Sequence, residues 1–184
     1  QPKTYPNALG VYMPDALSIF EANGASYLVT ANEGDAREWG DYVNEAKENL
    51  LASDNTEAEK VRVLDKDLTA VPDESKEYLY GGRSFAIYNA DTMELVYESG
   101  NDFEEKTAAY LPNWFNCSND DIEPDSRSAK KGPEAESVTV GQIGEKTYAF
   151  IALERIGGVM VYDITNPANA TYVNYINTRN FSEE

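Results

Sequence analysis

The sequence contains no histidine and has few basic residues for its length. Its 184 residues include 33 acidic and 15 basic side chains, which gives a formal net charge of −18. The lack of histidine excludes a histidine-ligated zinc site and any catalytic dyad or triad that needs a histidine from this chain. A nucleic-acid partner is not expected either, because binding to phosphates requires a basic surface.

Cysteines and long apolar segments are also scarce. Cys117 is the single cysteine, so the chain cannot form an internal disulfide bond. No segment reaches the roughly 18 consecutive apolar residues of a membrane-spanning helix, so no membrane span is expected. With 41% hydrophobic and 11% aromatic residues, the chain is still too apolar for an acidic disordered protein, and we expect a folded core. The start at Gln1, without a methionine, suggests a piece of a longer protein.

The chain contains an internal repeat of four short segments. The first copy comprises residues 14–19, 27–33, 85–89 and 94–97, and the second comprises 133–138, 148–154, 159–163 and 171–175. The segments are rich in Val, Ile, Tyr and Phe and are bounded by Gly, Asn, Asp or Pro, which is typical of β-strands. In both copies a Gly-Gly pair precedes the third segment. Four antiparallel strands per copy indicate a β-propeller blade, and the alternative is two unrelated β-meanders.

We therefore predict a mainly β fold, namely a β-propeller-like fragment of two four-stranded antiparallel blades that pack face to face. Within a single domain or fragment (1–184), blade one spans about residues 14–100, an acidic loop spans 101–132, and blade two spans about 133–178. Because a propeller needs about 4–8 blades to close, two blades leave sheet edges exposed. The expected partners are the remaining blades of a longer protein, or a second copy that associates through edge strands.

Residues 34–80 interrupt blade one and differ in character from the repeat. Asp41 can serve as an N-cap, and the residues at roughly helical spacing after it are Tyr42, Val43, Ala46, Leu50 and Leu51. The stretch 56–64 is either a second helix or a helix that continues into a strand. The prediction is a helical insertion that lies over one end of the blade.

Carboxylates recur at the ends of the predicted strands, with Glu33 and Glu154 at equivalent places and Asp15 opposite Glu134. Equivalent positions of propeller blades face the same end of the central channel, so these acids should converge. Oxygen ligands without histidine suit Ca²⁺, with Mg²⁺ as the alternative. The acidic loop offers further oxygen ligands but lacks the pattern of an EF-hand. The candidate metal ligands are Glu33, Asp35, Glu134, Glu136, Glu154, Asp120, Asp121 and Asp125. The alternative is that these acids are solvated or paired with arginines.

Three arginines lie within distinctive sequence blocks, 31–42, 81–85 and 152–163: Arg37, Arg83 and Arg155. A guanidinium group can bind a phosphate through two parallel hydrogen bonds, so the three arginines are candidate anion ligands. The alternative is that they only neutralise the neighbouring carboxylates.

Five blocks of sequence, taken in order, resemble the bacterial secreted choice-of-anchor I domain family. The blocks are residues 31–42, 81–85, 99–104, 119–134 and 152–163. Members of this family are often described as alkaline phosphatase-like, and the same domain resembles an echinoderm mesenchyme-specific cell-surface glycoprotein. One departure is Ser137, where the family usually has glycine.

The resemblance implies an extracellular or periplasmic cell-surface protein of several blades, of which this chain is the middle portion. Two functions follow as hypotheses. The first is a binding or structural role for an acidic, Ca²⁺-binding propeller segment. The alternative is part of a metal-dependent phosphomonoesterase, whose site would need residues from further blades. A protein–protein scaffold remains a third interpretation.

Overall fold

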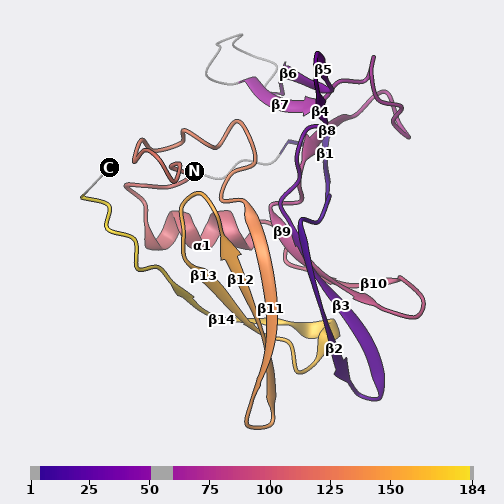
Figure 1. The fold of residues 1–184 in the computed structure, drawn as a ribbon, viewed down its shortest axis with the longest axis vertical. Helices are drawn as coiled ribbons and strands as arrows, with labels where there is room; N and C mark the ends of the chain where they lie inside the picture. Colours follow the sequence, from indigo (N-terminus) through magenta and orange to yellow (C-terminus); the bar gives the residue numbers. More distant parts are fainter. Residues whose placement is uncertain (1–4, 51–59, 183–184) are drawn as a thin grey trace.

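Strands dominate the structure, a computed structural model that describes residues 5–50 and 60–182 (Figure 1). One α-helix, α1 (Asp102–Tyr110), occurs in this part of the chain. The predicted mainly β class is therefore confirmed. No helix among the described residues has the length and apolar character needed to cross a membrane.

The first sheet holds the four segments of the first repeat copy. Its strands, in spatial order, are β10 (Leu95–Glu98), β9 (Ser84–Asn89), β3 (Ala25–Asn32) and β2 (Ala16–Ala22), and all neighbours are antiparallel. Asn32 pairs with Ser84 at one end of the two central strands, and both residues are fully buried. The central strands therefore end in a covered region, and Glu33 follows directly.

The second sheet holds the second repeat copy in consecutive order. Its strands are β11 (Ala135–Ile143), β12 (Lys146–Leu153), β13 (Val159–Asp163) and β14 (Thr171–Ile176), again all antiparallel. A two-residue turn joins β11 to β12, and its Gly144 takes the positive φ of 63° that such turns require. A short 3-10 helix, η2 (Pro167–Asn169), precedes β14.

The two sheets and α1 share one hydrophobic core. The rings of Phe85 on β9 and Tyr162 on β13 lie 4.6 Å apart between centroids, and Phe103 of α1 stacks on Phe85 at 6.1 Å. These three side chains are fully buried. The core side chains thus come from both repeat copies and connect the sheets directly.

The predicted helical insertion is wrong for the described residues 34–50 and 60–80, because strands occupy this region. They are β4 (Glu38–Trp39), β5 (Tyr42–Val43), β6 (Glu45–Asn49), β7 (Lys60–Leu64) and β8 (Glu77–Tyr80). A third sheet has the order β1-β8-β7-β6, in which β1 (Ala8–Val11) runs parallel to β8. The rest of the predicted helical stretch, residues 51–59, lies outside the described part.

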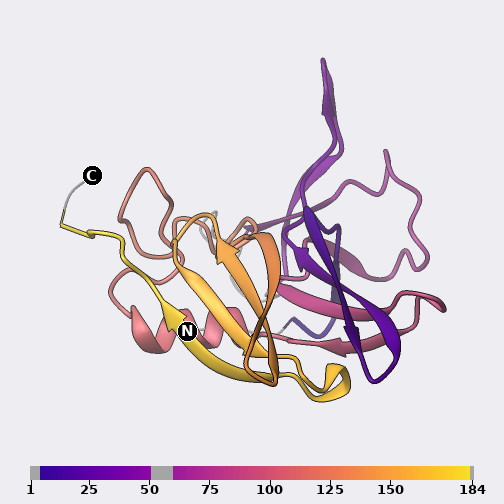
Figure 2. The same cartoon turned by 60° about the horizontal axis from the view of Figure 1, so that its bottom comes forward.

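Local sequence features explain why the insertion is not helical. Val61 and Val63 of β7 are buried while Lys60 and Arg62 are partly exposed, which is the two-residue period of a strand. Leu64, at the end of the strand, is buried as well. Gly40 takes a φ of 58° and turns the chain between β4 and β5, at the point where Asp41 was expected to begin a helix. The β4–β5 hairpin stands away from the sheets at the top of Figure 2, with Trp39 87% exposed.

Helix α1 lies within the segment 101–132 that the sequence indicated as an irregular acidic loop. Asp102, Glu104 and Glu105 occupy its first turn, where carboxylates interact favourably with the helix dipole. Phe103 and Thr107 are one turn apart and form its buried side. With two buried positions, the amphipathic signal was too short to indicate a helix.

Candidate functional site

The end of β3 is held in place by two glycines. Gly34 and Gly81 have φ values of 77° and 71°. A Cβ atom on Gly34 would lie 2.0 Å from the Gly81 nitrogen, and one on Gly81 would lie 1.8 Å from the Glu33 carbonyl oxygen. Only glycine allows this close crossing of backbones, which fixes the position of Glu33.

The start of β11 carries two further acidic side chains. Glu134 has a φ of 57°, and its carbonyl oxygen accepts a 2.8 Å hydrogen bond from the Glu154 amide. Glu136 lies at a β-bulge, where the pairing with β12 shifts between Ala135 and Ser137. Bulges redirect a side chain out of the regular alternation, so Glu136 can face the same region as its neighbours.

These elements bring five acids together, which we call the carboxylate cluster: Asp15, Glu33, Glu134, Glu136 and Glu154. It consists of two groups that share Glu33. Oxygens of Asp15, Glu33 and Glu136 lie within 4.8 Å of one another, and so do oxygens of Glu33, Glu134 and Glu154. Such spacing fits the oxygens around a Ca²⁺ ion, whose ligands lie at about 2.3–2.6 Å from the metal.

Glu134 is neutralised by three cationic side chains. It is fully buried, and it accepts hydrogen bonds from the Arg127 guanidinium, with Nε at 3.1 Å. Its Oε2 lies 3.0 Å from Lys131 Nζ and 3.1 Å from Arg155 Nε. Burial alone would raise the pKa of Glu134, but Arg127 and Lys131 outweigh it and lower the pKa below its ordinary value. For this residue the ion-paired interpretation holds.

Glu33 is in a different electrostatic setting. Burial and a hydrogen bond with Glu136 raise the pKa of Glu33 to about 8, although a hydrogen bond from Lys131 opposes the shift. Among the described residues, neither Asp15 nor Glu136 forms an ion pair with a cationic side chain. The Asp15–Glu33–Glu136 group is therefore short of positive charge.

Glu154 resembles Glu33 in having a raised pKa, and it resembles Glu134 in having an arginine partner. Burial raises its pKa, helped by the negative charges of Glu134 and Glu136, while the Arg155 guanidinium opposes the shift. Arg155 Nη1 lies 3.1 Å from Glu154 Oε1 and donates a 2.8 Å hydrogen bond to Asn119 Oδ1. Of the three arginines named from the sequence, Arg155 is thus the one that contacts the cluster.

The remaining candidates lie outside the cluster. Asp35 is beside it, with its Oδ1 3.7 Å from Lys131 Nζ, but its side chain is 81% exposed. Three loop carboxylates accept hydrogen bonds within their own loop: Asp120 from Ser118, Asp121 from the Glu123 amide, and Asp125 from Ser128. Arg83 pairs with Glu104 at 2.5 Å, and the side chain of Arg37 forms no ion pair among the described residues.

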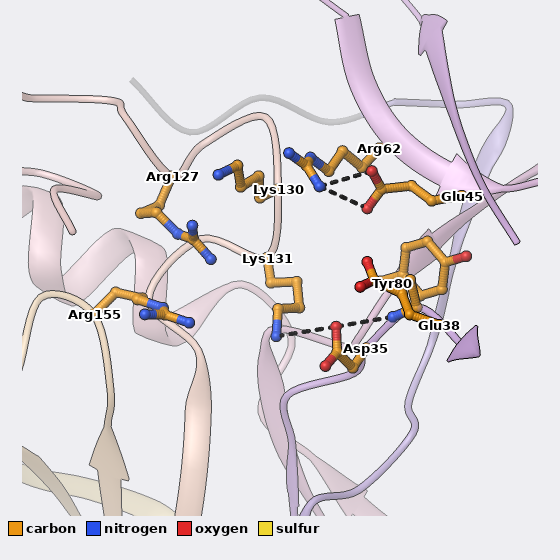
Figure 3. A pocket seen from close by; sticks show the side chains of 10 residues that line it. Asp35, Glu38, Glu45, Arg62, Tyr80, Arg127, Lys130, Lys131 and Arg155 are labelled. Atoms are coloured by element: carbon orange, nitrogen blue, oxygen red, sulfur yellow. Dashed lines mark hydrogen bonds and ion pairs between the residues drawn. The ribbon is translucent and has the colours of Figure 1, made fainter. Parts of the chain in front are cut away.

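A pocket of about 160 Å³ adjoins the carboxylate cluster (Figure 3). It lies between β6 and β7 of the third sheet on one side and the loop before β11 on the other. Five cationic side chains line it: Arg62, Arg127, Lys130, Lys131 and Arg155. Lys131 and Arg155 also contact cluster carboxylates, so the pocket and the cluster share a wall.

Comparison with known proteins supplies the family. The model of the choice-of-anchor I domain matches residues 1–167. The chain belongs to the choice-of-anchor I domain family. Gigasin-3a of Magallana gigas is 40% identical over 96 residues, which are 50% of this chain and 34% of that protein. The mesenchyme-specific cell surface glycoprotein of Strongylocentrotus purpuratus is 28% identical over 109 residues, 52% of this chain and 14% of that protein. The chain thus spans well under two thirds of either relative, and no solved structure matches it.

The sequence interpretation missed the cations that this choice-of-anchor I domain places around its acids. Arg127, Lys130 and Lys131 were not among the candidate residues, nor was Arg62. A signal was present, because residues 127–131 hold three of only 15 basic residues in the chain. A basic segment of this kind in a strongly acidic sequence indicates a local need for positive charge.

Proposed function

We propose that this chain is a segment of an extracellular surface protein and that its carboxylate cluster binds Ca²⁺, with Mg²⁺ as the alternative. Membership of the choice-of-anchor I family supports the surface location, as does the likeness to a protein named as a cell surface glycoprotein. The role is binding or structural. The cation would join the ends of the two repeat-derived sheets.

The observation that carries the proposal is the Asp15–Glu33–Glu136 group. Its three carboxylates come from different strand ends and have oxygens within 4.8 Å of one another. The whole cluster holds five carboxylates and contacts three cations, Arg127, Lys131 and Arg155, which leaves two negative charges when all five acids are ionised. One divalent cation with hard-ligand preference would balance them.

The propeller-like arrangement is part of the same proposal. In both sheets the acid that follows the second strand, Glu33 or Glu154, reaches the cluster. Equivalent acids from further blades would approach the same axis. Leu17 and Ile19 on the edge strand β2 are 65% and 61% exposed, an apolar surface that a neighbouring blade or a second copy would cover.

Isothermal titration calorimetry with CaCl₂ tests the cation site on the 184-residue chain. Glu136→Gln removes one negative charge at the proposed site. Mutation of residues that only support metal ligands lowers metal affinity by roughly 10–100-fold, so we expect the Ca²⁺ affinity to fall by at least this much. Glu145→Gln makes the same change at an exposed residue in the turn at the far end of β11 and should leave binding unchanged. If the unaltered chain binds neither Ca²⁺ nor Mg²⁺, the cation site does not exist.

A metal-dependent phosphomonoesterase is the second candidate, and one contact favours it. Arg155 pairs with Glu134 and Glu154, so a cationic side chain lies where a metal-bound phosphoryl group would need charge stabilisation. The test is hydrolysis of p-nitrophenyl phosphate by the whole protein with Ca²⁺ or Mg²⁺. Hydrolysis that disappears in Glu33→Gln would favour the esterase, and no hydrolysis with either metal would exclude it.

A further inference from the structure

Lys130 differs from the other four cationic side chains that line the pocket described above, because it has no acidic partner among the described residues. The other four have acidic partners: Arg62 pairs with Glu45, Arg127 with Glu134, Lys131 with Glu33 and Arg155 with Glu154. Within residues 5–50 and 60–182, no carboxylate pairs with the Lys130 ammonium. Figure 3 shows Lys130 between Arg127 and Arg62 among the side chains that line the pocket.

The loop that carries Lys130 is held by its backbone and leaves the ammonium free. The Arg62 amide donates a 2.8 Å hydrogen bond to the Ala129 carbonyl, which attaches the loop to β7. Arg83 Nη2 donates to the carbonyls of Ser128 at 2.9 Å and Lys130 at 2.6 Å. Contacts from both sides therefore fix the main chain around Lys130, while its side chain contributes nothing to that anchoring.

The electrostatic environment of Lys130 is unfavourable in the absence of a ligand. Partial burial, followed by the positive charges of Arg127 and Arg62, lowers the pKa of Lys130 below its ordinary value. The acids on the pocket lining do not relieve this, because Glu45 is already paired with Arg62 and both Asp35 and Glu38 are exposed. An anion in the pocket would relieve the repulsion among these cations.

We propose that this pocket binds the sulfate or phosphate group of an anionic ligand, with Lys130 as its principal contact. Guanidinium groups match the oxygens of such groups through paired hydrogen bonds, and an ammonium group adds a compact positive charge. A volume of about 160 Å³ accommodates a small group rather than a polymer surface. The site requires neither the proposed divalent cation nor any hydrolysis, so it goes beyond the proposed function.

Calorimetric titration in EDTA at constant ionic strength tests the site independently of the cation. The probes are sodium sulfate, sodium phosphate, glucose 6-sulfate and glucose 6-phosphate. Lys130→Ala should weaken binding by about tenfold or more, because a charge-assisted hydrogen bond is lost. Lys130→Arg should retain most of the affinity. Lys146→Ala removes the same charge at the opposite end of β12 from Glu154 and should bind like the unaltered chain.

The results separate the sources of the anion. Binding of all four probes with loss in Lys130→Ala supports a site for the free group, and binding of the esters alone supports a group carried on a sugar. The side chain of Lys130 makes no ion pair or hydrogen bond among the described residues, so circular dichroism should show Lys130→Ala folded. If no probe binds, or if Lys130→Ala and Lys146→Ala weaken binding equally, the proposal is overturned.

Discussion

Lys131 donates a hydrogen bond to Glu33, a residue 98 positions earlier in the chain. The same ammonium lies 3.0 Å from Oε2 of Glu134. Lys131 therefore links the end of β3 in the first sheet to the residue before β11 in the second. It also contacts Glu33, the residue that the two groups of the carboxylate cluster share, so an added cation would have to compete with it there.

Gly81→Ala should destabilise the protein far more than Gly24→Ala. Both glycines have positive φ values, 71° and 78°, so both alanines incur the roughly 1–2 kcal/mol of left-handed backbone strain. At Gly24 an added Cβ meets nothing within 4 Å, whereas at Gly81 it would lie 1.8 Å from the Glu33 carbonyl oxygen. Thermal unfolding of the two variants measures the difference. Equal Tm losses would contradict the close crossing of backbones that positions Glu33.

Phe85 and Tyr162 should be energetically coupled, because their rings meet across the two sheets at 4.6 Å. In a double-mutant cycle with Phe85→Leu and Tyr162→Leu, we expect a coupling free energy of about 0.5–1.5 kcal/mol from urea unfolding. The control pairs Phe85→Leu with Trp39→Leu. Trp39 is 87% exposed on the projecting hairpin and cannot touch the buried Phe85, so these two effects should add. Additivity in the first cycle would mean that the sheets do not share a core.

Asp163 should titrate far below an ordinary aspartate. A hydrogen bond from Lys146, together with hydrogen bonds from Thr165, lowers the pKa of Asp163 from 3.8 to about 2. Because the folded-state pKa is lowered, this group stabilises the fold above about pH 4, and its contribution is lost as the pH falls towards 2. In Lys146→Met, carbon-detected NMR should show the Asp163 pKa rising towards 3.8. Lys47→Met, at an exposed position of β6, should leave it unchanged.

Much of the architecture could be predicted because the repeat encodes it locally. Segments such as 148–154 are short, nearly continuous apolar runs with glycines on either side, Gly144 and Gly157, so strand positions follow from sequence alone. Equivalent positions in the two copies place Glu33 and Glu154 at matching strand ends, and their carboxylates indeed lie within 4.8 Å of each other. The repeat therefore allowed the proximity of two residues that are far apart in the sequence to be predicted from local patterns.

Other features depend on contacts that no local pattern reveals. The third sheet forms because β1 pairs in parallel with β8, about 70 residues later, and the Tyr42–Leu50 spacing does not encode this pairing. The neutralisation of Glu134 likewise arises from three side chains brought in by a loop and a strand end. Which acids remain available to a cation is therefore decided by tertiary packing, even where the acids themselves are evident in the sequence.

Lys131→Met should lower the stability of the chain and raise its affinity for Ca²⁺. The methionine preserves most of the side-chain volume but leaves Glu33 and Glu134 without their shared cation. Removing one partner of a buried ion pair costs about 3–5 kcal/mol, so the Tm in EDTA should fall substantially. Lys131 forms an ion pair with Glu33 in the cation-free protein, so it competes with an added cation for this carboxylate. The Lys131→Met substitution removes that competition. The recovery of Tm on adding CaCl₂ should accordingly be larger in Lys131→Met than in the unaltered chain.

Arg127→Met is the matched control for this last effect. Arg127 also pairs with Glu134, so its loss should destabilise the protein similarly, yet no ion pair joins it to Glu33 among the described residues. Calcium should therefore rescue Lys131→Met more fully than Arg127→Met. Equal rescue of both variants would indicate that calcium acts only through net charge. If CaCl₂ restores the Tm of neither variant, no cation binds at Glu33. A cation bound to that carboxylate would replace the positive charge that Lys131 provided and would therefore raise the Tm of Lys131→Met.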